Sequence, residues 1–172
     1  WSPQDGWERI TSTLVANVTM ATGFGFLLVA AYALRPTVTP RQGAFWGAAG
    51  FAVFFLAPSF GLPPELPGTV AGALADRQAW WLATVSCTAA GLGLLAFAPK
   101  RWFKLGGAGL LIIPHLIGAP HPASYNGAAP EHLAKQFFIA ALLANAIFWI
   151  ALGIVSAWVY RRCACGSSKQ GI

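Results

Sequence analysis

Five stretches of the chain are almost entirely apolar, with the few charged side chains between them. They run from about Ile10 to Leu34, Gln42 to about Pro58, Ala79 to Ala98, Trp102 to Ile117 and about Phe137 to Tyr160. A helix needs about 20 apolar residues to cross the bilayer's hydrocarbon core, and lipid offers the backbone no hydrogen-bond partners. We therefore predict an all-α integral membrane bundle with five transmembrane helices in this chain.

Proline and glycine separate the predicted helices. Residues 58–68 hold four prolines, and residues 118–130 are rich in proline and glycine, so neither stretch continues a helix. At 172 residues we expect one transmembrane domain over residues 1–162, followed by a disordered cytoplasmic tail over residues 163–172.

The composition strengthens the membrane interpretation. Only 9% of residues are charged and 56% are hydrophobic, whereas a soluble domain is about 25% charged. The net charge of +6 comes from basic residues scattered between apolar stretches rather than gathered on one soluble face. This distribution argues against nucleic-acid binding.

The basic residues also predict an orientation, because cytoplasmic flanks carry an excess of lysine and arginine. Eight of them lie at alternate helix ends: Arg35, Arg41, Lys100, Arg101, Lys104, Arg161, Arg162 and Lys169. Only Arg9, Arg77 and Lys135 lie at the opposite ends. We expect a multi-pass protein of the bacterial inner (cytoplasmic) membrane with its C-terminus in the cytoplasm. Trp1 then lies outside, and a further helix before it would give six.

Every acidic residue and every histidine falls on the predicted outer side. The candidate metal ligands are His115, His121, Glu65, His132 and Asp5. Imidazole and carboxylate groups suit divalent cobalt, nickel and zinc. Two alternatives stay open: acids gather outside simply because basic residues stay inside, and His115 caps a helix that Pro114 interrupts.

Few polar residues lie within the apolar stretches. Thr13 and Asn17 share one helix face with Met20, and Asn145 lies in the last stretch. These faces either line a polar path or serve helix packing, in which small and hydroxyl residues are common.

No phosphate-binding loop and no HExxH, GxSxG or CxxC motif is present, so nothing indicates an enzyme. Cys163 and Cys165 form a CxC pair that binds a soft metal, carries a lipid or lies reduced in the tail.

Several strings are more specific. WSPQDGWER, FAVFFLAPSFGLPPELPG, DRQAWWLATVSCTAAGLGLLAF, PHLIGAPHP and WVYRR occur in this order over nearly the whole chain. Together they resemble the probable cobalt transporter subunit family, CbtA. The resemblance implies a subunit of a cobalt uptake system, accompanied by a small single-helix partner of the CbtB type that bears histidines. The family positions that it carries over are Asp5, Glu65, Gln78, His115 and His121.

We therefore predict a membrane subunit that forms or lines a permeation path, with a cobalt or nickel ion as substrate and no firmly implied cofactor. The alternative is a non-transporting scaffold subunit of a larger membrane complex. A membrane complex or a homo-oligomer fits either function.

Overall fold

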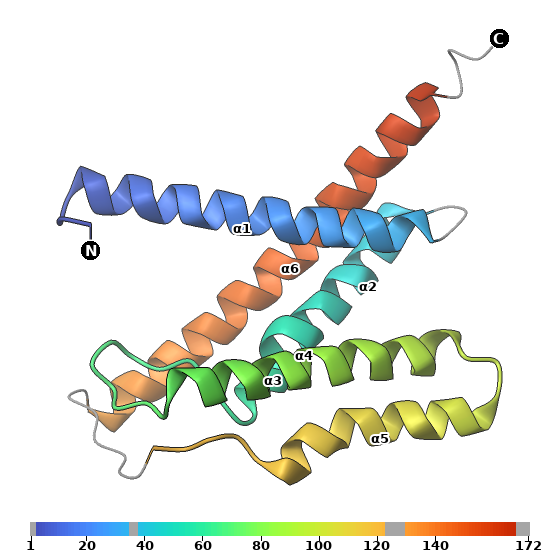
Figure 1. Cartoon of the computed structure of the whole chain (residues 1–172). Helices are drawn as coiled ribbons and strands as arrows, with labels where there is room; N and C mark the ends of the chain where they lie inside the picture. The colour runs from blue at the N-terminus through green and yellow to red at the C-terminus, as the bar shows by residue number, and fades with distance from the viewer. Residues whose placement is uncertain (1–2, 35–37, 123–129, 168–172) are drawn as a thin grey trace. The chain divides into compact units, whose positions relative to one another are not determined.

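The computed structural model describes residues 3–34, 38–122 and 130–167, and every regular element in these ranges is helical. The elements are α1 (Trp7–Ala33), α2 (Pro40–Phe51), the π-helical segment η1 (Ala52–Leu56), α3 (Ala57–Ser59), α4 (Leu74–Phe97), α5 (Arg101–Ile117) and α6 (Glu131–Ser167) (Figure 1). The chain divides into two compact units. Unit 1 comprises residues 1–47 and 149–172, and unit 2 comprises residues 48–148.

Three helices are long and apolar enough to cross a membrane: Trp7–Ala33, Leu74–Phe97 and Glu131–Ala164. The all-α prediction is therefore confirmed for the described residues. The second predicted span is a continuous helical stretch, because α2, η1 and α3 follow one another without a break. The fourth, α5, has 17 residues. Five transmembrane helices in this chain and six in the full protein stay predictions.

Two helices extend beyond their apolar stretches. α4 begins at Leu74 rather than Ala79, and α6 runs from Glu131 to Ser167 rather than from Phe137 to Tyr160. Hydropathy locates only the apolar part, whereas a helix continues while each further residue adds a backbone bond. An acidic residue in each first turn also interacts well with the helix dipole.

The predicted tail is partly described. α6 includes residues 163–167, which we had assigned to a disordered tail, whereas residues 168–172 lie outside the described residues. Trp1, Arg35 and Lys169, which entered the predicted orientation, also lie outside them. One domain over residues 1–162 stays a prediction.

Glycine allows α2 and α6 to approach closely in unit 1. A Cβ atom on Gly153 would collide with the carbonyl oxygen of Gly43 and would lie 2.9 Å from the Cα atom of Gly47. Gly43 and Gly47 are equally crowded by the α6 backbone. Small residues of this kind let helix backbones pack in an apolar medium, where no hydrophobic force drives helices together.

Tyr32 connects α1 to α2 and α6 near the point where these two helices approach each other. Its side chain is fully buried, and its hydroxyl oxygen lies 3.1 Å from the Gly153 carbonyl oxygen and 3.1 Å from Ser156 Oγ. The ring meets Trp46 and Tyr160 edge-on, at centroid distances of 6.0 and 5.9 Å. One tyrosine thus contacts both other helices of unit 1.

In unit 2, α4 and α5 lie side by side in opposite directions (Figure 1). The two backbones approach closely at Gly91 and Gly107, where a Cβ on either residue would lie within 2.8 Å of the other's carbonyl oxygen. η1 and α3 pack against α4 as well. The antiparallel pair brings the start of α4 next to the end of α5.

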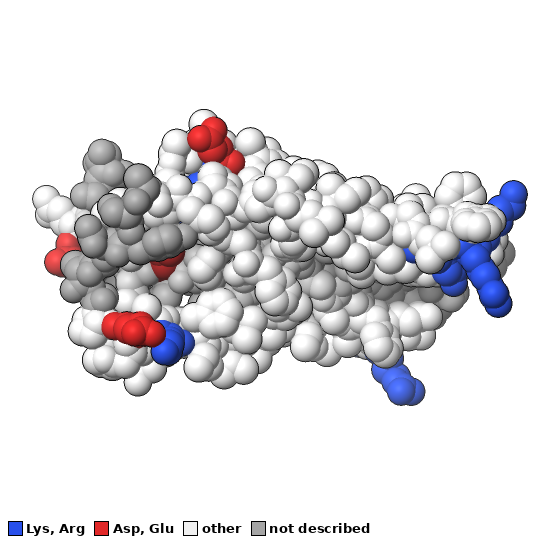
Figure 2. Space-filling view, turned by 90° about the horizontal axis from the view of Figure 1, so that it is seen from below, with Lys and Arg blue, Asp and Glu red and all other residues white. Residues whose placement is uncertain are grey.

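Charged residues lie near the ends of the long helices. Lys, Arg, Asp and Glu are absent from residues 10–34 of α1 and its C-cap, from residues 78–97 of α4 and from residues 136–160 of α6. Most of the surface drawn in Figure 2 is accordingly uncharged. Such surfaces suit contact with lipid or with other apolar helices.

Gly153→Ala should destabilise the protein by about 1–3 kcal/mol, because the added methyl group meets backbone atoms that cannot move aside. The measurement is thermal unfolding of the purified protein in detergent.

Gly23→Ala is the matched control, since nothing lies within 4 Å of a Cβ at that position in α1. It should leave stability unchanged or raise it by up to about 1 kcal/mol. Equal behaviour of the two variants would contradict the close crossing.

Candidate functional site

Two loops meet where α4 begins and α5 ends. A Cβ on Gly72 would lie 3.4 Å from the carbonyl oxygen of Pro120 and 3.6 Å from the carbonyl carbon of His121. The proline-rich loop after α3 therefore runs beside the segment after α5. Glu65 pairs with Arg77 in the first turn of α4. His115 lies in the last turn of α5, and His121 follows it. These three candidate ligands therefore lie at one end of the α4–α5 pair.

His115 lies in the last turn of α5 and contacts two aromatic rings. Its imidazole meets the rings of Phe60 and Trp80 edge-on, each at a centroid distance of 6.0 Å. The side chain is half-buried. These contacts help to orient the imidazole and leave part of it accessible.

Trp80 supports His115 through the backbone of α5. Its indole Nε1 donates a hydrogen bond of 3.1 Å to the carbonyl oxygen of Pro114, the residue before His115. The tryptophan is only 8% exposed, and Gly61 is the residue that leaves room for its ring. Pro114 cannot donate a backbone hydrogen bond within α5, which weakens this turn. The hydrogen bond from Trp80 stabilises the weakened turn.

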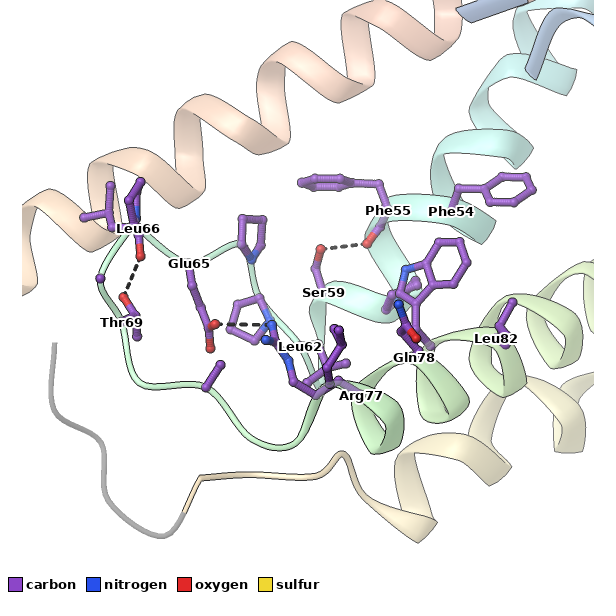
Figure 3. A pocket seen from close by; sticks show the side chains of 18 residues that line it. Phe54, Phe55, Ser59, Leu62, Glu65, Leu66, Thr69, Arg77, Gln78 and Leu82 are labelled. Atoms are coloured by element: carbon purple, nitrogen blue, oxygen red, sulfur yellow. Dashed lines mark hydrogen bonds and ion pairs between the residues drawn. The ribbon is translucent and has the colours of Figure 1, made fainter. Parts of the chain in front are cut away.

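An open groove of about 920 Å³ lies beside this region, between the proline-rich loop and the first turns of α4 (Figure 3). Aromatic walls come from Phe54 and Phe55 of η1 and from Trp81 of α4. Polar groups come from Glu65, Arg77 and Gln78. The groove thus combines apolar walls with a few polar groups, as ligand sites commonly do.

Glu65 and Arg77 form an ion pair within the groove. Arg77 Nη2 lies 3.2 Å from Glu65 Oε2, and the two side chains are 28% and 27% exposed (Figure 3). The carboxylate that we selected as a metal ligand therefore already has a cationic partner. Any cation that binds Glu65 has to compete with this guanidinium.

The π-helical segment that supplies Phe54 and Phe55 has a local cause. Pro58 has no N–H group to offer the carbonyl of Phe54, and a proline ring clashes with the carbonyl four residues earlier. The preceding turn widens, and the N–H of Ala57 bonds to the carbonyl of Ala52, five residues back. Ser59 Oγ donates to the Phe55 carbonyl oxygen at 2.6 Å. π-Helical turns of this kind are frequent at functional sites.

The other candidate ligands lie elsewhere. Asp5 is exposed and pairs with Arg9, and His132 is exposed in the first turn of α6. His121 is exposed in the segment after α5. Among the described residues, no three side chains of His, Cys, Asp and Glu come together as a group that could hold a metal ion. The predicted shell of Glu65, His115 and His121 is therefore not assembled in this structure.

The polar helix positions also differ from one another. Thr13 and Asn17 are exposed on α1, and Gln78 is exposed at the groove. Asn145 is half-buried and donates its amide to the Ala141 carbonyl oxygen at 2.9 Å, within its own helix. Cys163 is a free, exposed thiol on α6, and the side chain of Cys165 lies outside the described ones.

Three contributors to this region were missed by sequence reasoning. Arg77 counted there only as a basic residue on the outer side, and Phe60 and Trp80 had no role near His115. A signal was available for Arg77 alone, since a basic and an acidic residue on the same predicted side invite pairing. Nothing in residue spacing indicated that Trp80 reaches Pro114, 34 positions away.

Trp80→Phe should destabilise the protein by about 1 kcal/mol, the net value of one hydrogen bond, plus a small packing loss. The cost is modest because the Pro114 carbonyl still accepts a 3.1 Å bond from the Gly118 N–H. Thermal unfolding in detergent measures the change. Trp81→Phe is the control, because it alters a ring packed on Phe54 in the groove. It should destabilise the protein less than Trp80→Phe does. A larger loss of stability in Trp81→Phe would contradict the support role of Trp80.

Comparisons with curated proteins and with solved structures found no match to this chain. A family model does match, over residues 1–161, and its description is "Probable cobalt transporter subunit (CbtA)". The match covers nearly all of the chain and confirms the resemblance seen in its sequence strings: the chain belongs to the CbtA family of probable cobalt transporter subunits.

Proposed function

We propose that this chain is a membrane subunit of a cobalt uptake system and that it forms or lines the permeation path. Membership of the CbtA family over residues 1–161 carries the proposal. It is supported by three helices apolar enough to span a membrane and by the gathering of Glu65, His115 and His121 at one end of α4 and α5. The proposed activity is transport of the ion, without a catalytic step.

The first step is capture of Co²⁺ at the outer end of unit 2. Carboxylates at a mouth with apolar walls raise the local concentration of cations. Imidazole nitrogen then suits cobalt or nickel better than it suits the hard ions magnesium and calcium. His115, whose imidazole contacts the rings of Phe60 and Trp80, is the first candidate ligand. His121 supplies a second imidazole from the adjacent segment, and Asp5 and His132 remain further candidates.

Arg77 acts in this proposal as a tethered counter-ion for Glu65. A divalent ion attracts the carboxylate about twice as strongly as the guanidinium does at equal distance, because Coulomb energy scales with charge. A monovalent ion has no such advantage over Arg77. The ion pair would therefore favour divalent cations and would displace the captured ion when it closes again.

In the predicted orientation, the C-terminus lies in the cytoplasm of a bacterial inner membrane. The captured ion then passes from the outer end of unit 2 to the cytoplasm. The amide oxygen of Asn145 and the exposed face of Thr13 and Asn17 offer neutral oxygen ligands along the spans. The membrane potential supplies about 2.3 kcal/mol per charge per 100 mV, and a divalent ion receives twice that amount.

Other subunits complete the path in this proposal. Only 6% of the most apolar window of α1 is buried within the chain. That exposed helix would pack against the expected sixth helix, a small CbtB-type partner with histidines or a second copy of the chain.

A scaffold subunit without transport activity is the second candidate. It is favoured by the absence of any charged residue from the central parts of α1, α4 and α6. A scaffold should leave cobalt uptake unaffected by changes at the outer histidines, whereas a subunit that lines the path should not.

The double variant His115→Gln/His121→Ala should lower cobalt uptake at least about tenfold, the loss expected even from changes to groups that support metal ligands. Uptake of radioactive cobalt by cells that express the intact system is the measurement. Expression level and thermal unfolding serve as checks on folding. Unchanged uptake in a folded double variant would contradict the capture role and favour the scaffold.

Arg77→Gln should lower the KM for cobalt uptake about two- to fivefold, because a partly exposed ion pair contributes up to about 1 kcal/mol. Glu65→Gln should raise the KM. Lys135→Gln is the control: it breaks the exposed pair with Glu131 at the start of α6 and should leave the KM unchanged. The same KM in Arg77→Gln and in the unmodified protein would show that the guanidinium does not compete with the metal.

A further inference from the structure

The turn between α4 and α5 carries three basic residues within five positions. Lys100, Arg101 and Lys104 lie here, and residues 99–106 are all exposed. This basic turn, residues 99–105, has a defined backbone: α4 ends at Phe97 and α5 begins at Arg101. The cations are thus presented from the ends of two packed helices.

No acidic side chain of the described residues pairs with these cations. The ion pairs there are Arg9 with Asp5, Arg77 with Glu65 and Lys135 with Glu131. Glu65 and Asp76 lie at the opposite end of α4, a helix of 24 residues, which is about 36 Å long at 1.5 Å per residue. The basic turn therefore has an uncompensated positive charge.

Large apolar side chains interleave with the cations. Trp102 is 81% exposed, Phe103 52% and Leu105 63%. Tryptophan is enriched at the level of lipid headgroups, where its apolar ring and polar N–H are both accommodated. The positive end of the α5 dipole lies at the same place and adds to the charge of the side chains.

We propose that the basic turn binds the phosphate groups of anionic phospholipids, with Trp102 and Leu105 inserted beside the headgroup. Charge complementarity selects the occupant, because no acidic side chain in the described ranges pairs with the cations and they lie at the ends of apolar helices. A water-soluble polyanion would leave the aromatic and aliphatic side chains uncovered. The lipid contact would hold the α4–α5 pair at a fixed depth, independently of any transported metal.

A local fluorescence measurement tests this. The intact chain, with Cys87, Cys163 and Cys165 replaced by serine, carries Leu105→Cys labelled with bimane. It is reconstituted in phosphatidylcholine vesicles that contain either brominated phosphatidylglycerol or brominated phosphatidylcholine as the quencher. We expect phosphatidylglycerol to associate at position 105 at least about fivefold more strongly, the fold-change that one basic residue near the surface supplies.

Two comparisons make the result specific. Lys100→Gln/Arg101→Gln/Lys104→Gln should abolish the preference, whereas Lys100→Arg/Lys104→Arg, which keeps the charge, should retain it. Leu116→Cys, 79% exposed near the other end of α5, should report no preference. Equal quenching by both lipids at position 105 would overturn the proposal, and so would a preference that survives the triple glutamine substitution. The same preference at position 116 would also overturn it, because attraction would then be a property of the whole protein.

Discussion

The rest of this structure depends on one constraint: in apolar surroundings, polar groups have to find their hydrogen-bond partners within the protein. Among the described residues, every buried side-chain nitrogen and oxygen has such a partner. Thr22, Thr84, Asn145 and Ser156 each donate to the carbonyl four residues earlier in their own helix. Polar residues in the spans are thus largely satisfied locally. Contacts between helices are therefore made by glycine and by aromatic residues that carry one polar atom.

Tyr32 and Trp80 show how such aromatic residues work. Each buries a large ring, and each directs its single polar group at a backbone carbonyl of another helix, Gly153 for Tyr32 and Pro114 for Trp80. A buried carbonyl can accept a second bond, so neither contact disturbs the helix that receives it. In unit 2 this arrangement also fixes the ring beside His115. The contacts that pack these helices together therefore also position the candidate ligand His115.

The sequence predicted the helical class, the approximate positions of the helices and the end of α4 and α5 at which acids and histidines gather. Apolar length and proline position determine these features. Pairings between distant residues were not predictable in the same way. Glu65 was selected as a candidate metal ligand, but its partner Arg77 comes from a different element. Trp80 had no predicted role near His115, although it is nearly buried and contacts that histidine. Hydropathy shows which residues leave water, but not which neighbour each one meets.

The π-helical turn in residues 52–56 bears on how relatives of this chain are aligned and compared. A π turn holds an additional residue, so removing one residue there would restore the α-helical register. The wider turn absorbs this residue, so the helix faces before and after residues 52–56 would keep their relative orientation when it is removed. The change would be confined to the turn that carries Phe54 and Phe55, so only this part of the groove wall would be rebuilt. A single-residue gap at this point in an alignment would therefore mark a relative whose groove differs at this one wall, while the positions on both sides of the gap stay structurally equivalent.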